Sequence, residues 1–164
     1  MRSDHTYYSQ LSWRGTTGAG PDGYERVHRV VMPPGGSELV LTSGVAFEGS
    51  AALANPEELL LAATSSCQLL SYLAYAAAAR IDVLSYEDHA EALMPADAKP
   101  MRITQIVLRP RITVADGADA GRAARLVERA HRACFIANTL NAEVKLEPEV
   151  EQAGQRLGPS KPSI

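Results

Sequence analysis

Near the middle of the chain stands the segment Asn55-Pro56-Glu57-Glu58-Leu59-Leu60-Leu61-Ala62-Ala63-Thr64-Ser65-Ser66-Cys67. Asparagine is favoured at a helix N-cap, where its side chain accepts a free backbone N–H, and proline is favoured at the first helical position. The carboxylates of Glu57 and Glu58 then suit the positive end of the helix dipole. The sequence therefore predicts a helix from Pro56 to about Arg80, roughly 38 Å long at 1.5 Å per residue.

The 21 residues from Leu59 to Ala79 carry no charge, which is long enough for a transmembrane helix. Polar side chains such as Ser66, Gln68 and Ser71, together with many alanines, argue against a membrane span. A helix that is apolar on all sides is otherwise buried in a core. Because a small domain cannot cover so long a helix alone, we expect an obligate homodimer in which the helix packs against its twin.

Alternating apolar residues on both sides of this helix predict strands. They cover residues 5–13, 24–32 and 38–42 before the helix; after it come a hairpin of residues 85–94 and 102–114, a second helix over 119–136 and a last strand over 143–150. This order, βββ-α-ββ-α-β, predicts an α+β fold with a long central helix. We expect a single domain over residues 1–150 and a disordered polar tail over 151–164.

Composition narrows the class of protein. The 16 basic and 19 acidic residues form no basic patch of the kind that binds nucleic acid or a membrane surface. The N-terminus has no apolar signal segment and two cysteines are too few for a secreted disulfide scaffold, so we expect a cytoplasmic protein. The four histidines are scattered, and no CxxC, GxSxG or phosphate-loop motif occurs, so we expect no metal and no cofactor.

The two cysteines, Cys67 and Cys134, are both expected inside helices, on apolar stripes. They are either inert core residues or a dithiol that cycles to a disulfide. A reactive cysteine attacks as the thiolate, and Cys67 lies three turns into its helix, too deep to gain from the dipole. A cation would have to come from elsewhere, oriented by Glu57. Ten residues, about 15 Å of helix rise, separate Glu57 from Cys67, so a shared site requires a bent helix or a subunit interface.

Three segments together resemble the OsmC/Ohr family of thiol-dependent hydroperoxide reductases. They are the run from Asn55 to Cys67, Ser85-Tyr86-Glu87-Asp88, and Ala130-His131-Arg132-Ala133-Cys134-Phe135-Ile136-Ala137. The resemblance implies an OsmC-like fold, an intertwined homodimer with active sites at its interface, and a role in the stress response. It also implies that Cys67 is the peroxidatic cysteine, Cys134 the resolving cysteine, and Glu57 the carboxylate that holds a catalytic arginine.

The implied reaction reduces organic hydroperoxides, and hydrogen peroxide less well, through a Cys67 sulfenic acid and a Cys67–Cys134 disulfide. A dithiol, in related enzymes a lipoyl group, would then reduce the disulfide. The segments 15–23 and 44–50, where the arginine is expected, contain none; Arg14, Arg26 and Arg29 are the candidates. The alternative function is a non-enzymatic OsmC-like dimer that binds a small apolar or thiol-reactive ligand at the subunit interface.

Overall fold

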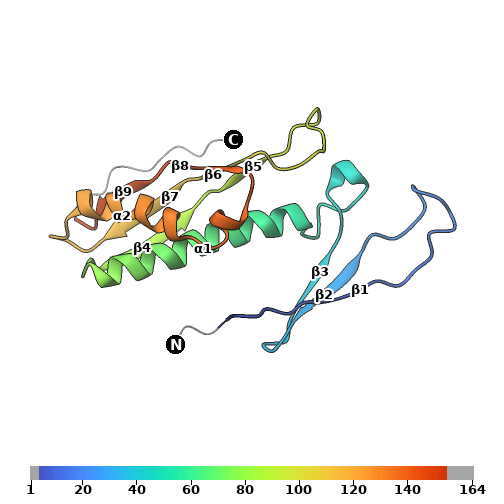
Figure 1. Ribbon diagram of the computed structural model, residues 1–164, viewed down its shortest axis with the longest axis horizontal. Helices are drawn as coiled ribbons and strands as arrows, with labels where there is room; N and C mark the ends of the chain where they lie inside the picture. Colours follow the sequence, from blue (N-terminus) through green and yellow to red (C-terminus); the bar gives the residue numbers. More distant parts are fainter. Residues whose placement is uncertain (1–3, 155–164) are drawn as a thin grey trace. The chain divides into compact units, whose positions relative to one another are not determined.

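The computed structural model of the protein describes residues 4–154 (Figure 1). The chain forms two compact units that divide between Leu60 and Leu61, inside the long helix α1 (Pro56–Ala78). The α+β class and the two helices are confirmed. Within residues 4–154, nine short strands replace the six longer ones that the sequence predicts, and their interruptions have identifiable causes.

The N-terminal unit contains an antiparallel sheet in the order β1-β2-β3. Its strands are β1 (Gln10–Ser12), β2 (His28–Met32) and β3 (Ser37–Leu41), followed by the short 3₁₀ helix η1 (Val45–Phe47). The first two strands are shorter than predicted because side-chain hydrogen bonds, and not backbone pairing between strands, hold the connection between them. The indole Nε1 of Trp13, for example, donates to the backbone oxygen of Glu25 at 2.7 Å.

Helix α1 begins as predicted. The Oδ1 of Asn55 accepts from the N–H of Glu58 at 2.9 Å, and the Oε2 of Glu58 accepts from the N–H of Asn55 at 3.1 Å. This reciprocal pair is a capping box, which satisfies two backbone donors at the helix start. The helix ends at Ala78, because Arg80 takes the left-handed conformation (φ 57°) and Ile81 N–H donates back to Ala76 O at 3.0 Å.

The C-terminal unit places two three-stranded sheets beside the helices, in the orders β4-β7-β9 and β5-β6-β8. The predicted hairpin is confirmed, since β4 pairs with β7 and β5 with β6, both antiparallel. The elements after α1 are β4 (Val83–Asp88), β5 (Glu91–Leu93), β6 (Gln105–Leu108), β7 (Pro110–Val114), α2 (Ala120–Ala133), the 3₁₀ helix η2 (Ala137–Thr139), β8 (Glu143–Leu146) and β9 (Glu149–Gln152).

Each predicted long strand of this unit is broken in two, and the breaks lie together. Asp88 Oδ1 accepts from the backbone N–H of Arg109 at 2.7 Å, and the Arg109 guanidinium donates to Glu147 at 2.8 Å and Glu91 at 3.2 Å. At the breaks, side-chain hydrogen bonds thus replace backbone hydrogen bonds between strands. Pro110 and the proline between β8 and β9 add to the break, because proline has no N–H to donate.

The core of this unit lies between α1, α2 and the strand β7. Helix α1 contributes one buried stripe with a spacing of four residues, namely Thr64, Gln68, Tyr72 and Ala76. Helix α2 contributes Ala123, Leu126, Val127 and Ala130, and β7 contributes Ile112 and Val114. Helix α2 and the hairpin strand β7 therefore both turn apolar side chains toward α1.

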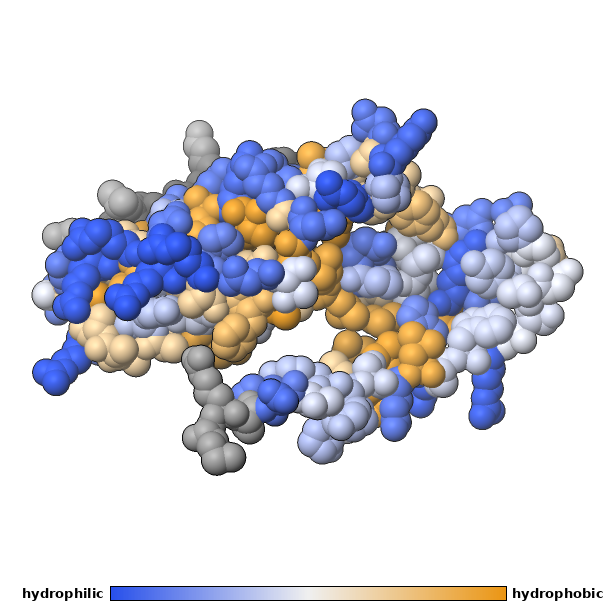
Figure 2. Space-filling model, in the orientation of Figure 1, coloured by the Kyte–Doolittle hydropathy of each residue, from blue (hydrophilic) through white to orange (hydrophobic). Residues whose placement is uncertain are grey.

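The expectation that α1 is buried on all sides is wrong for the single chain. Leu70 is 64% exposed and Leu73 38% exposed, and apolar surface is visible along this helix in Figure 2. Helix α1 is long and apolar enough to cross a membrane by length and composition alone, a criterion that core helices of soluble proteins also meet. The buried amide of Gln68 and hydroxyl of Thr64 form its inward stripe instead.

The expected tail over residues 151–164 is only partly described. Strand β9 includes Glu151 and Gln152, paired in parallel with Thr113 and Val114 of β7. Residues 155–164 lie outside the described residues, so a disordered tail stays a prediction, as does the single domain over residues 1–150.

Candidate functional site

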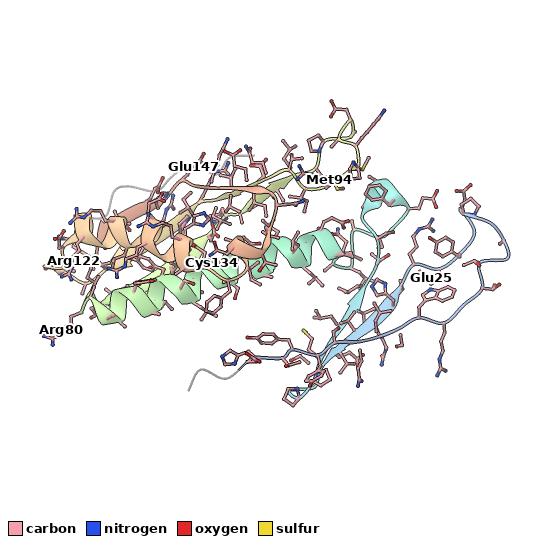
Figure 3. All side chains as sticks on the ribbon, viewed as in Figure 1. Glu25, Arg80, Met94, Arg122, Cys134 and Glu147 are labelled. Carbon is pink, nitrogen blue, oxygen red and sulfur yellow. The ribbon has the colours of Figure 1, made fainter. Side chains whose placement is uncertain are left out.

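The structure brings the two cysteines together in the C-terminal unit. Cys67 lies on α1 and is half-buried, whereas Cys134 is fully buried at the end of α2. Both are free thiols, and they lie next to each other. Figure 3 shows Cys134 beside α1. The two residues are 67 positions apart in the chain, and their contact depends on the packing of α2 against α1.

Cys134 does not lie inside the second helix, as the sequence suggested. It is the C-cap residue, with an extended backbone (φ −67°, ψ 116°), and α2 ends at Ala133. The side-chain amide of Asn138 donates to the backbone oxygens of Arg132 (3.1 Å) and Cys134 (2.9 Å). It thereby satisfies carbonyl groups that the helix end leaves free, which stabilises the early stop.

The turn after Cys134 directs two backbone amides at the two sulfur atoms. Ile136 N–H donates to Cys67 Sγ, and Ala137 N–H donates to Cys134 Sγ, each with an N···S distance of 3.5 Å. Successive backbone N–H groups in a turn present partial positive charge and stabilise anions. The protein backbone therefore supplies a donor for each sulfur atom. Neither amide could be predicted from the sequence, because nothing in the residue types at 136 and 137 marks them.

The buried thiol of Cys134 has a raised pKa. Burial is the main cause and the neighbouring Cys67 thiol is the next, and together they raise the pKa of Cys134 to about 11. Cys134 therefore keeps its proton at neutral pH. Cys67 Sγ accepts the Ile136 N–H.

Two tyrosines pack under the dithiol, with ring centroids 5.9 Å apart. Burial raises the pKa of Tyr72 to about 12, and burial together with the charges of Asp88, Tyr72 and Cys134 raises the pKa of Tyr86. The neighbouring Gln68 donates from Nε2 to Val127 O at 3.1 Å. Gln68 Oε1 and both tyrosine hydroxyls find no hydrogen-bond partner within residues 4–154. The tyrosines carry no distinguishing sequence signal, since they fit an apolar core stripe equally well.

The third predicted site residue, Glu57, lies in the N-terminal unit. It lines a cavity of about 870 Å³ formed by the β1–β2 connection, the segment after β3 and the start of α1. Arg26 lines the same cavity, whereas Arg14 and Arg29 do not. Arg29 pairs with Glu38 at 2.9 Å and has a side chain that is 62% exposed. Among the three candidate arginines, Arg26 is therefore the one that shares a cavity with Glu57.

Arg26 is held by other groups than Glu57. Its guanidinium forms an ion pair with Glu48 and donates to the backbone oxygens of Pro21 (2.8 Å) and Tyr24 (3.0 Å). It also lies over the ring of Tyr24, 4.3 Å from the centroid. Glu57 has no ion-pair partner among the described residues. The role that the family resemblance implies for Glu57 stays a prediction, and Arg26 pairs with Glu48.

Within residues 4–154 no group of three or more histidine, cysteine, aspartate and glutamate side chains is placed to hold a metal ion. The C-terminal unit holds two neighbouring thiols: that of Cys134 has a raised pKa, and Cys67 Sγ accepts the Ile136 N–H.

Relatives of the chain occur among known proteins. The model of the family described as OsmC-like protein matches residues 49–149. An OsmC-like protein of unknown function from Vibrio cholerae has 27% sequence identity and a TM-score of 0.81, over 89% of this chain and 100% of that chain. No curated protein sequence matches the chain.

Two more distant structures share the fold. An organic hydroperoxide resistance protein from Legionella pneumophila has 19% identity and a TM-score of 0.67, over 92% of this chain and 99% of its own. An organic hydroperoxide resistance protein from Elizabethkingia anophelis, with thiocyanate bound, has 19% identity and a TM-score of 0.68, over 93% of this chain and 99% of its own.

Proposed function

The chain belongs to the OsmC-like protein family, and we propose that it is a cysteine-based peroxidase that reduces organic hydroperoxides, and hydrogen peroxide less well. The observation that carries the proposal is that the thiols of Cys67 and Cys134 lie next to each other, with the Ile136 N–H donating to Cys67 Sγ. Two structural relatives are named organic hydroperoxide resistance proteins, which agrees with this chemistry.

In the first step the Cys67 thiolate attacks the distal oxygen of the hydroperoxide. The O–O bond breaks, the proximal oxygen leaves with a proton as the alcohol, and Cys67 becomes a sulfenic acid. The Ile136 N–H and the Cys134 S–H are the donors that stabilise negative charge on the Cys67 sulfur before attack. The half-buried position of Cys67 leaves a path for the peroxide.

In the second step Cys134 attacks the sulfenic sulfur, loses its proton, and displaces the oxygen as water, which closes the Cys67–Cys134 disulfide. The two thiols are already neighbours, so little movement is needed. A dithiol, for which we propose a lipoyl protein, donates two electrons and two protons to restore both thiols. We further propose that the protein is a cytoplasmic homodimer, in which a second copy covers the exposed leucines of α1.

The test uses cumene hydroperoxide with dihydrolipoamide as reductant. We expect turnover by the wild type and none by Cys67→Ser, because the nucleophile is lost. Cys134→Ser should accumulate a sulfenic acid that dimedone labels, whereas the oxidised wild type should lose the two thiol hydrogens in its intact mass. Ser66→Ala is the matched control, since it removes an exposed hydroxyl next to Cys67 and leaves both thiols.

Undiminished turnover in Cys67→Ser would refute the peroxidase. A wild type that consumes no peroxide, yet binds alkylating or apolar compounds at Cys67, would instead support the non-enzymatic alternative.

A further inference from the structure

Four arginines form a stripe along the exposed side of helix α2. This arginine stripe consists of Arg122, Arg125, Arg129 and Arg132, whose spacing places them within an arc of about 80° around the helix axis. All four are exposed, whereas the buried residues of α2 lie on a different side of the helix. Glu128 is the single acidic residue of α2. The net charge of −3 for the whole chain therefore conceals a strongly basic surface.

The four guanidiniums are not neutralised by carboxylates. The ion pairs found within residues 4–154 involve other cations, namely Arg26, Arg29, Arg109, Arg111 and Lys145. Residues 155–164 contain no acidic side chain that could cover the stripe. Arg129 lies over the ring of Tyr75 of α1, 4.9 Å from its centroid, and strongly hydrophilic surface covers α2 in Figure 2. The arginine stripe thus offers uncompensated positive charge to an anionic partner.

The stripe ends beside the dithiol. Cys134 is the C-cap residue of α2, two positions after Arg132, and its thiol lies next to that of Cys67. Figure 3 labels Arg122 near the start of this helix and Cys134 at its end. From Arg122 to Arg132 the stripe extends about 15 Å along the helix, short enough to lie within the interface of one small protein domain. A domain bound on the stripe therefore holds any dithiol that it carries close to the two cysteines.

The charges at the edge of the stripe favour a compact acidic protein over an extended polyanion. Exposed carboxylates border its N-terminal end: Asp116 and Asp119 precede α2, and the backbone oxygen of Asp82 accepts from Ala115 N–H at 2.9 Å. A membrane surface or a nucleic acid would meet these carboxylates together with the arginines, and the repulsion would offset part of the attraction. A folded domain with a local acidic patch can contact the arginines alone.

We propose that the arginine stripe docks the reductant, an acidic protein domain that carries a dithiol of the lipoyl type on a tether. This inference rests on the proposed function, because it adds a docking surface to the reduction step. In that step one reductant thiolate attacks a sulfur of the Cys67–Cys134 disulfide, the S–S bond breaks, and the second reductant thiolate resolves the mixed disulfide. Two electrons and the two thiol protons pass to the cysteines, and the reductant ends as a cyclic disulfide. The arginines raise the local concentration of the dithiol and take no part in the exchange.

The experiment measures how fast two reductants reduce the disulfide, which diamide forms without any peroxide. One is the dihydrolipoyl form of a lipoyl domain with a net negative charge, and the other is free dihydrolipoamide, which has no docking surface. The double variant Arg122→Glu/Arg125→Glu reverses two charges that lie roughly 14 to 18 Å along the helix from Cys134, too far to touch the reacting sulfur atoms. We expect it to lower the second-order rate constant of the domain by about tenfold or more and to leave that of dihydrolipoamide unchanged. Added salt should slow the wild type toward the variant.

The matched control is Lys99→Glu/Arg102→Glu, which makes the same change of net charge on the exposed connection between β5 and β6. It should slow the domain by about twofold or less, because charges farther than a Debye length are screened. Circular dichroism checks that both double variants are folded. Titration calorimetry of the same lipoyl domain with the reduced protein gives a second readout, in which Arg122→Glu/Arg125→Glu should raise Kd by about tenfold.

The proposal is overturned if the two double variants slow the domain equally, if Arg122→Glu/Arg125→Glu has no effect on the domain, or if it slows free dihydrolipoamide as much. It is also overturned if the stripe binds phosphatidylserine vesicles or duplex DNA more tightly than the domain. Neither readout uses a peroxide, and the calorimetry needs no disulfide. Failure of the peroxidase test and failure of the docking test are therefore distinguishable.

Discussion

The buried thiol of Cys134 makes the stability of the protein depend on alkaline pH. Its pKa lies near 11 in the folded chain, against 9.0 for an unperturbed thiol. The folded state therefore keeps a proton that the unfolded state has lost between about pH 9 and 11. By linkage, the contribution is fully present below pH 9 and is lost as the pH rises toward and through 11. Burial is the main cause of the raised pKa, because it makes the ionised thiolate unfavourable in the folded state.

The size of the effect follows from the folded and unfolded pKa values of this one thiol. The difference between about 11 and 9.0 corresponds to about 3 kcal/mol of unfolding free energy at pH values well above 11, and to about 2 kcal/mol at pH 10.5 relative to pH 7. Replacing Cys134 by alanine removes the titrating group. The substitution also leaves a small cavity, but that cost of about 1 kcal/mol is the same at every pH.

The assay is urea denaturation followed by circular dichroism, with a reductant present and the protein concentration fixed. We expect the unfolding free energy of the wild type to fall between pH 7 and 10.5 by about 2 kcal/mol more than that of Cys134→Ala. Burial is the main cause of the raised pKa of both Tyr72 and Tyr86 and is kept in Cys134→Ala, so the tyrosines contribute nearly equally in the two proteins and the difference reports mainly on the thiol. Cys67→Ala is the control, because it keeps the burial of Cys134 and should keep most of the pH dependence. Parallel curves for the wild type and Cys134→Ala would show that the buried thiol is not the titrating group.

Substitutions at two positions test the end of α1 and its buried face. Arg80→Gly should raise the melting temperature, with a gain of about 0.5–1 kcal/mol, because Arg80 holds a left-handed φ of 57° that glycine adopts without strain; no gain relative to Arg80→Ala would contradict this. Gln68→Glu should lower the unfolding free energy at neutral pH by about 3 kcal/mol or more, since it buries a carboxylate against the oxygen of Val127, whereas Gln68→Met should cost about 1 kcal/mol or less. Equal effects of the two Gln68 variants in urea denaturation would show that the site is not buried as described.

The parts of the fold that are local in sequence could be predicted. The start of α1 follows from Asn55, Pro56 and Glu58, which form the capping box within four residues of each other. The apolar face of α2 follows from its periodicity, and the hairpin after α1 follows from two alternating runs around a proline-containing turn. In each case the residues that determine the element also lie within it.

Features that depend on distant contacts could not be predicted. The strand breaks at Asp88 and Arg109 arise from a side chain 21 positions away in sequence, which periodicity does not contain. The end of α2 depends on the Asn138 amide, so the interior position expected for Cys134 was wrong. The pairing of the two thiols was implied by a family resemblance, and the ion pair between Arg26 and Glu48 had no sequence signal. The structure supplied both contacts.

The early end of α2 links the fold to the chemistry. Because the helix stops at Ala133, Cys134 turns into the core, where burial raises its pKa, and two of the free amides that follow donate to the sulfur atoms. The early end of the helix thereby buries Cys134, which raises its pKa, and gives each sulfur atom one backbone N–H donor. A helix that continued to Ile136 would have tied the N–H groups of residues 136 and 137 to carbonyls one turn back. The different environments of the two thiols therefore originate within the C-terminal unit and do not require a guanidinium.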